Sequence, residues 1–241
     1  MDDDEKRQQV KAWLRLARHE ALTRKDAERR YKIIVSGFYM GKQRRKGDER
    51  CCARCMASVQ GMRRRGTAAN YFEDVRHAFH TCHVEVWKLV LNWWHGRTGQ
   101  LLVVDERTTL MGDRQRPEAE QNGTSFAGLE EPWVLLHAAT LQVIWEERAR
   151  TRENAAPRPA ATLWKLIRLR FARDAQDHLR WVAAQRAYMD EDMLAWLEKE
   201  RKPLSVEYVY DVWQESGLGT VRLGEKVPFV LHTTHHGGEP G

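Results

Sequence analysis

The sequence of 241 residues contains no long hydrophobic run. No apolar segment reaches the roughly 18 residues that a membrane-spanning helix needs, so we expect a soluble protein. The first residues, Met-Asp-Asp-Asp-Glu, contain no apolar stretch of the kind that directs export. We therefore expect an intracellular protein, nuclear or cytoplasmic, whose thiols stay reduced.

Signatures of catalysis are also missing. The chain has no Gly-x-Ser-x-Gly turn and no convincing nucleophile beside a base. Residues 219–226 are similar to a phosphate-binding loop, but Glu225 displaces the lysine and no Ser or Thr follows, so a hairpin turn is favoured. We predict that the chain is not an enzyme.

Cysteine is scarce and confined to one segment, between Cys51 and Cys82. Three cysteines and one histidine form the pattern Cys52-x2-Cys55-x21-His77-x4-Cys82. Three thiolates and one imidazole provide a closed tetrahedral shell, which suits structural Zn²⁺ and leaves no open position for catalysis. The sequence therefore predicts a structural zinc site that joins two distant parts of the chain.

Alternatives to this ligand set stay open. Cys51 could replace Cys52, and His80 or His83 could replace His77. The cysteines could also form disulfides or remain free thiols. Because we expect a reducing compartment, clustered cysteines favour metal over disulfides.

Positive charge is concentrated beside the Cys-x2-Cys turn. Residues 42–65 contain nine basic and two acidic residues, a net charge of +7, whereas the whole chain carries +6. Such a patch is typical of proteins that contact the phosphate backbone of RNA or DNA, although glycine-rich solvated loops can have the same composition. The residues expected to contact nucleic acid are Lys42, Arg44, Arg45, Lys46, Arg63, Arg64 and Arg65.

Apolar periodicity predicts a mainly α fold: a small helical zinc-stapled domain, then a helical region and a short β-rich C-terminal end. The expected helices lie at about residues 10–21, 27–40, 84–94, 133–145, 161–188 and 190–202. Alternating apolar residues predict strands at 206–212, 221–223 and 227–231.

The expected organisation has four parts. A helical zinc-binding domain with a basic loop covers residues 1–95, and a linker or mobile loop covers 96–131, with a short strand at 101–104. A helical region follows at 132–202, and short strands with a flexible tail complete the chain at 203–241.

The segment that contains the last two ligands has a family-like pattern, Glu73-x3-His77-x-Phe79-x2-Cys82. It follows a Cys-x2-Cys turn and precedes a helix that contains Trp87, Trp93 and Trp94. This segment resembles the zinc-binding domain at the C-terminal end of reverse transcriptases from non-LTR retrotransposons. The resemblance covers about residues 28–95 and extends weakly, through the helix that starts at Trp133, to about residue 150.

The positions of two further residues imply roles that do not depend on this resemblance. Glu73 lies one helical turn before His77 and would orient the imidazole, unless it is a solvent-facing helix cap. Phe79 would pack under the metal site. The catalytic aspartates of a polymerase are missing, because the similar residues 188–193 have an inserted Glu191 and are better interpreted as the start of a helix at Asp190.

Two classes of function follow. The first is a non-catalytic accessory domain that binds zinc and nucleic acid, as in the C-terminal part of a retrotransposon reverse transcriptase. The second is a zinc-stapled helical scaffold that binds a protein partner through exposed tryptophans; a retrotransposon remnant without selected activity is a further alternative.

Overall fold

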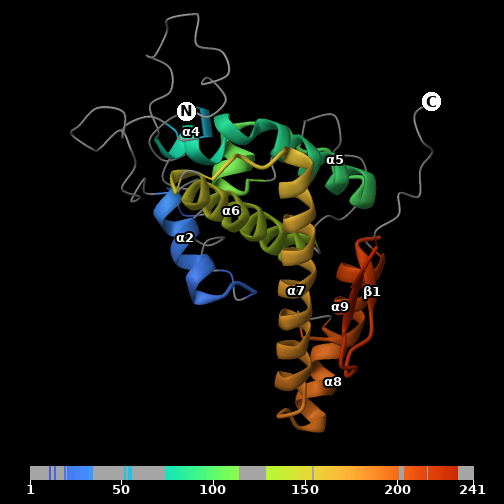
Figure 1. Ribbon diagram of the computed structural model, residues 1–241. Helices are drawn as coiled ribbons and strands as arrows, with labels where there is room; N and C mark the ends of the chain where they lie inside the picture. Colours follow the sequence, from blue (N-terminus) through green and yellow to red (C-terminus); the bar gives the residue numbers. More distant parts are fainter. Residues whose placement is uncertain are drawn as a thin grey trace, which may run out of the picture.

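A computed structural model of the chain is mainly α-helical, with a small two-stranded sheet near its C-terminal end, which confirms the predicted fold class (Figure 1). The structure describes residues 11, 14, 19, 21–34, 52, 54–55, 74–113, 129–153, 155–200, 204–215 and 217–232. Among these residues, no helix is both long enough and apolar enough to cross a membrane.

The elements follow one another along the chain. The α-helices are α2 (Arg24–Ile34), α4 (Val75–Phe79), α5 (Val84–Thr98), α6 (Glu130–Arg152), α7 (Ala160–Arg186), α8 (Glu191–Lys199) and α9 (Val206–Tyr210). Shorter turns are the 3-10 turn η4 (Thr81–His83) and the π-helical turns η5 (Arg107–Met111) and η8 (Asp211–Glu215). Strand β1 (Gly219–Val221) pairs antiparallel with β2 (Phe229–Leu231).

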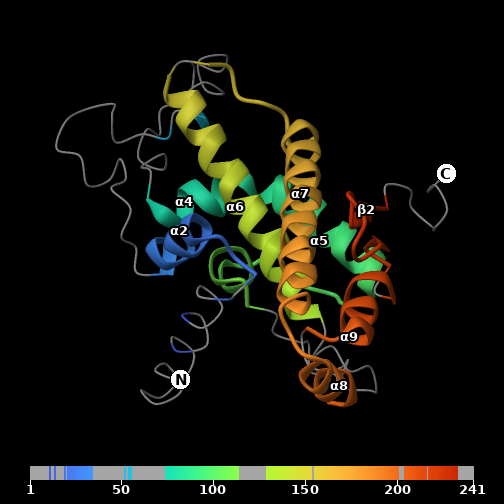
Figure 2. The ribbon, with the colours of Figure 1, turned by 90° about the horizontal axis from the view of Figure 1, so that it is seen from below.

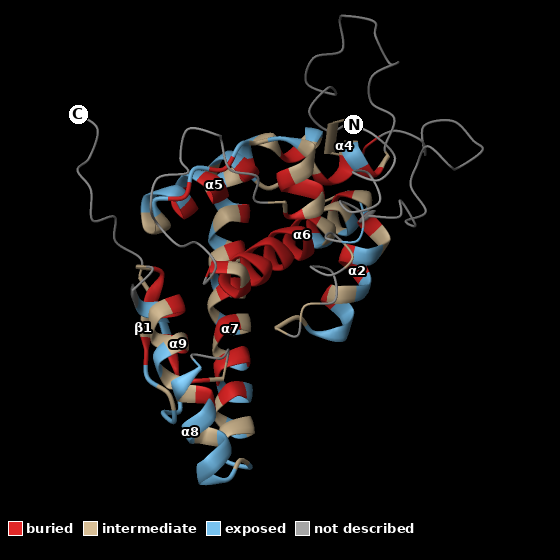
Figure 3. Ribbon diagram, turned by 180° about the vertical axis from the view of Figure 1, so that it is seen from behind, coloured by how far each residue is buried: buried red, intermediate tan, exposed pale blue. Residues whose placement is uncertain are grey.

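Helix α6 lies at the centre of the molecule, with α7 alongside it (Figure 2). Every residue from Glu131 to Ile144 is buried, so this part of the helix is covered on all sides (Figure 3). A helix that is apolar around most of its circumference requires such cover. The other helices therefore pack around α6.

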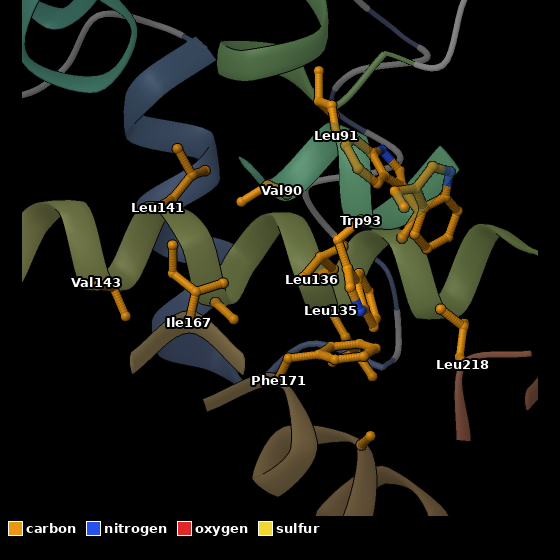
Figure 4. Packing of buried hydrophobic residues seen from close by; sticks show 14 of the residues in the cluster. Val90, Leu91, Trp93, Leu135, Leu136, Leu141, Val143, Ile167, Phe171 and Leu218 are labelled. Atoms are coloured by element: carbon orange, nitrogen blue, oxygen red, sulfur yellow. The ribbon is translucent and has the colours of Figure 1, made fainter. Parts of the chain in front are cut away.

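Aromatic rings join α5, α6, α7 and the C-terminal hairpin into one core. The ring of Trp93 on α5 lies 6.0 Å from that of Phe171 on α7, between the two helices (Figure 4). Phe171 also packs against Trp213 at 6.2 Å and Phe229 at 6.3 Å. The side chain of Phe171 is completely buried, so one residue connects three segments.

Two features expected near the C-terminus are confirmed. Asp190 caps α8, because its carboxylate accepts a hydrogen bond from the Met193 amide at 2.8 Å. The phosphate-loop-like residues 219–226 begin in β1 and lead through a turn into β2.

The strand expected at 206–212 was wrong. Residues in this segment form α9 and then η8. The Ser205 hydroxyl accepts a hydrogen bond from the Tyr208 amide at 3.1 Å, which starts a helix. Val209, Val212 and Trp213 are the buried residues, and their spacing of three and four fits a helix better than a strand.

Of the expected linker, residues 96–113 and 129–131 are described, and they differ from a loose connection because residues 130 and 131 already belong to α6. Its first residues complete α5, and no strand forms at 101–104. Leu102 and Leu110 belong to the core, and Trp133 donates a hydrogen bond to the Gly112 carbonyl at 2.8 Å. Polar composition suggested a loop, but contacts with α6 hold this segment in place. Residues 114–128 lie outside the described part, and the four-part division stays a prediction.

We expect Phe171→Ala to lower the free energy of unfolding by about 3–5 kcal/mol, because it removes a ring shared by three packed segments. Denaturation by urea, followed by circular dichroism, measures this change. Leu169→Ala on the same helix is the matched control, since Leu169 is 70% exposed, and should change stability by less than about 0.5 kcal/mol. Equal effects of the two substitutions would contradict this description of the core.

Candidate metal centre

Three chain segments bring four ligand-type side chains together. Cys52 and Cys55 come from the turn, His77 lies on α4, and Cys82 lies in η4. One ligand atom from each residue lies within 4.8 Å of all the others. The Cys55 sulfur lies 3.4 Å from that of Cys82 and 3.3 Å from His77 Nε2, and the sulfurs of Cys52 and Cys82 are 3.6 Å apart. This cluster can hold a metal ion.

The short helix α4 orients His77. Asp74 precedes the helix, and its carboxylate accepts a hydrogen bond from the His77 amide at 2.7 Å. The helix ends at Phe79, and the chain tightens into η4 before α5 begins at Val84. This break places Cys82 beside His77, although the two residues are five positions apart.

The side chains in the cluster strongly affect one another's pKa. Hydrogen bonds from Cys55 and Cys82 lower the pKa of the Cys52 thiol. Hydrogen bonds with Cys52 and Cys55 raise the pKa of His77 to about 10. The hydrogen bond with Cys52, followed by that with Cys55 and by burial, raises the pKa of Cys82. Three thiols this close lose their protons together only when a cation shares the negative charge, so the cluster favours a bound metal ion.

The surroundings leave little room for a substrate. A cavity of about 10 Å³ lies between the turn and α6, beside Cys52 and His83. Such a volume holds about one water molecule. Cys52 is buried, and the other three ligands are partly buried. The arrangement therefore suits a structural role better than an open catalytic one.

The histidine alternatives have other positions. His80 Nδ1 makes a hydrogen bond of 2.8 Å with the Thr109 hydroxyl. His83 is buried, and burial lowers its pKa to about 4. Neither residue belongs to the cluster, which contains His77.

Phe79 is completely buried two residues after His77. Its ring stacks on that of Trp145 at 5.9 Å, and its carbonyl accepts a hydrogen bond from Trp87 Nε1 at 2.7 Å. Phe79 thus anchors α4 to both α5 and α6, next to the ligand-bearing turn.

Several predicted site residues lie outside the described residues. These are Glu73, the alternative ligand Cys51, and all seven basic residues predicted to contact nucleic acid. Their roles stay predictions.

One contact was missed by the sequence analysis. Arg54, counted there among the basic residues of the loop, lies against Glu147 at the C-terminal end of α6, with 3.3 Å between Nη1 and Oε1. Burial alone would raise the pKa of Glu147, but hydrogen bonds from Arg150 and Arg158 lower it to about 2. Nothing in the local sequence pairs two residues that lie 93 positions apart.

Comparison with known proteins adds no relative. No family model matches the chain, no curated protein has a matching sequence, and no solved structure matches it. The resemblance to a reverse-transcriptase zinc-binding domain therefore stays a prediction.

We expect Cys82→Ser to abolish stoichiometric metal binding, because Cys82 contacts both cysteines of the turn. Cys51→Ser is the matched control and should retain one metal ion per chain, because the described cluster is completed by Cys52. Elemental analysis of each purified variant measures the metal content. If Cys51→Ser lost the metal and Cys52→Ser retained it, the ligand would be Cys51 instead of Cys52.

Proposed function

We propose that this protein is a non-catalytic, zinc-stapled helical domain that binds nucleic acid. The observation that carries the proposal is the approach of the ligand atoms of Cys52, Cys55, His77 and Cys82 to within 4.8 Å of one another. A tetrahedral zinc ion with metal–sulfur bonds of about 2.3 Å separates its sulfurs by about 3.8 Å. The sulfur of Cys82 lies 3.6 Å from that of Cys52 and 3.4 Å from that of Cys55, which is close to this value.

The role of the zinc is structural. Four protein ligands fill the tetrahedral shell, so no position remains for a substrate or an activated water. The ion fastens the Cys-x2-Cys turn to α4 and to η4, which directly precedes α5. In a structural site, the free energy of metal binding contributes directly to folding.

Nucleic acid is the partner that the charge distribution favours. In the sequence, the basic segment flanks the Cys-x2-Cys turn on both sides, and the zinc would hold this turn against the helical core. Further arginines lie at the end of α6 and in the loop that follows, namely Arg148, Arg150, Arg152 and Arg158, of which Arg150 and Arg158 are paired with Glu147. The resemblance to the reverse-transcriptase zinc-binding domain supports the same proposal.

A protein-interaction scaffold is the second candidate. Of the nine described tryptophans, five are buried, so most serve the core. Trp181 is 38% exposed and Trp196 is 49% exposed; with Tyr188 and Met193 they lie near the end of α7, in the turn that follows it and on α8. The argument for a scaffold therefore depends on this exposed group, and not on the total number of tryptophans.

We expect protein purified without added metal to contain one zinc ion per chain, as measured by native mass spectrometry. Removal of the zinc with a chelator should lower the thermal midpoint of unfolding, because the ion joins two segments of the chain. A fully folded chain without metal would overturn the proposed site.

We expect the zinc-loaded protein to bind RNA or DNA with an affinity that falls steeply between about 50 and 200 mM salt. Fluorescence anisotropy with a short single-stranded RNA and a DNA duplex measures this dependence. Replacement of Arg63, Arg64 and Arg65 by Gln should weaken binding and reduce the slope of log K against log salt by up to about three.

The matched control replaces three basic residues outside the proposed interface, Lys88, Arg180 and Arg222, each of which is paired with a carboxylate. This variant loses the same charge and should bind almost as tightly as the unmodified protein. Absence of binding at low salt would refute the nucleic-acid role and favour the scaffold.

A further inference from the structure

The carboxylate of Glu147 is completely buried and accepts hydrogen bonds from three arginines. Arg150 donates at 2.9 and 3.1 Å, and Arg158 donates through its amide and its Nε, each at 2.7 Å. The third donor is Arg54, at 3.3 Å. Arg150 belongs to α6, and Arg158 lies in the loop between α6 and α7.

Arg54 stands between the two cysteines of the turn. Its second guanidinium nitrogen donates to the Arg158 carbonyl at 2.9 Å, so both ends of the guanidinium contact the same corner of the fold. The planar fork of an arginine fixes direction as well as distance. Cys52 and Cys55 are therefore held by the fold through the residue that separates them, in addition to any contact with a metal.

The contact between Arg54 and Glu147 reduces the free-energy cost of ordering the turn, which is the main cost of a metal site built from distant segments. His77 and Cys82 are placed by α4 and η4, whereas the turn belongs to a separate part of the chain. Unless another interaction holds the turn in place, metal binding must itself order it and so loses affinity. A buried carboxylate that binds Arg54 reduces this ordering cost.

We propose that Glu147 is a positioning residue of the metal centre, which acts through Arg54 to hold the Cys-x2-Cys turn against α6 before the metal binds. The proposal rests on the proposed zinc site and assigns a function to residues that lie outside its ligand set. It also implies that zinc occupancy and the corner between α6 and α7 are coupled, since Arg54 and Arg158 share Glu147.

The test measures zinc affinity by competition with a chromophoric chelator, starting from the zinc-loaded chain. We expect Arg54→Gln and Glu147→Gln each to lower the affinity by about tenfold or more, the usual effect of losing a residue that supports a ligand. The double variant should lose less than the product of the two single losses, because both substitutions break the contact between Arg54 and Glu147.

Two matched controls separate positioning from general stability. Arg76→Gln removes an arginine that also adjoins a ligand, His77, but whose side chain is 64% exposed and paired with Glu106. Glu146→Gln removes the exposed neighbour of Glu147. Both controls should change zinc affinity by less than about twofold, since exposed charged side chains contribute little.

Unfolding of each metal-free variant by urea completes the experiment. If Glu147→Gln fails to fold, Arg54→Gln decides the outcome, because it leaves Glu147 paired with Arg150 and Arg158. Unchanged affinity in Arg54→Gln, or losses that multiply in the double variant, would overturn the positioning role. A wild-type chain that binds no zinc would instead refute the zinc site itself, and the positioning role with it.

Discussion

The burial of α6 on all sides is the constraint on which the rest of the fold depends. Fourteen consecutive residues, from Glu131 to Ile144, are covered by other elements, and the polar groups among them need partners inside the protein. Glu131 binds His178 on α7 at 3.2 Å, and His137 donates to the Thr109 carbonyl at 3.0 Å. These contacts hold α7 and the segment around η5 against the central helix.

The cluster of Cys52, Cys55, His77 and Cys82 extends this arrangement beyond the core. Phe79 stacks on Trp145 of α6, and Arg54 reaches Glu147 two residues further along the same helix. The two halves of the ligand set thus meet the C-terminal part of α6 through different contacts, one aromatic and one ionic. A metal ion bound by both halves would connect them directly, in addition to the contact that each half already makes with α6. This explains how four ligands from distant positions can be close together without forming part of the hydrophobic core.

Local patterns predicted the helices well where periodicity was strong. The stripe from Trp133 to Trp145 became α6, and Asp190 was recognised as a cap because capping needs only neighbouring residues. The alternation of Val206, Tyr208 and Tyr210 led to the wrong prediction of a strand. The same segment also has a helical spacing, but its buried face can be recognised only once α7 and the hairpin are in place. Residues 102–112 were missed as part of the core for a similar reason: their apolar residues follow no clear period, and the elements that they contact, α2, α4 and α6, are distant in the sequence.

By itself, the sequence determined the ligand chemistry, because thiolates and imidazole are properties of residue type and their pairwise spacing limits the turns that can hold them. It also determined the excess of positive charge around the turn. Only the tertiary structure decided which histidine joins the cysteines, because His77, His80 and His83 differ in direction rather than in chemistry. It likewise decided that Arg54 faces a buried carboxylate, since Glu147 approaches it only after the chain has folded across 93 positions.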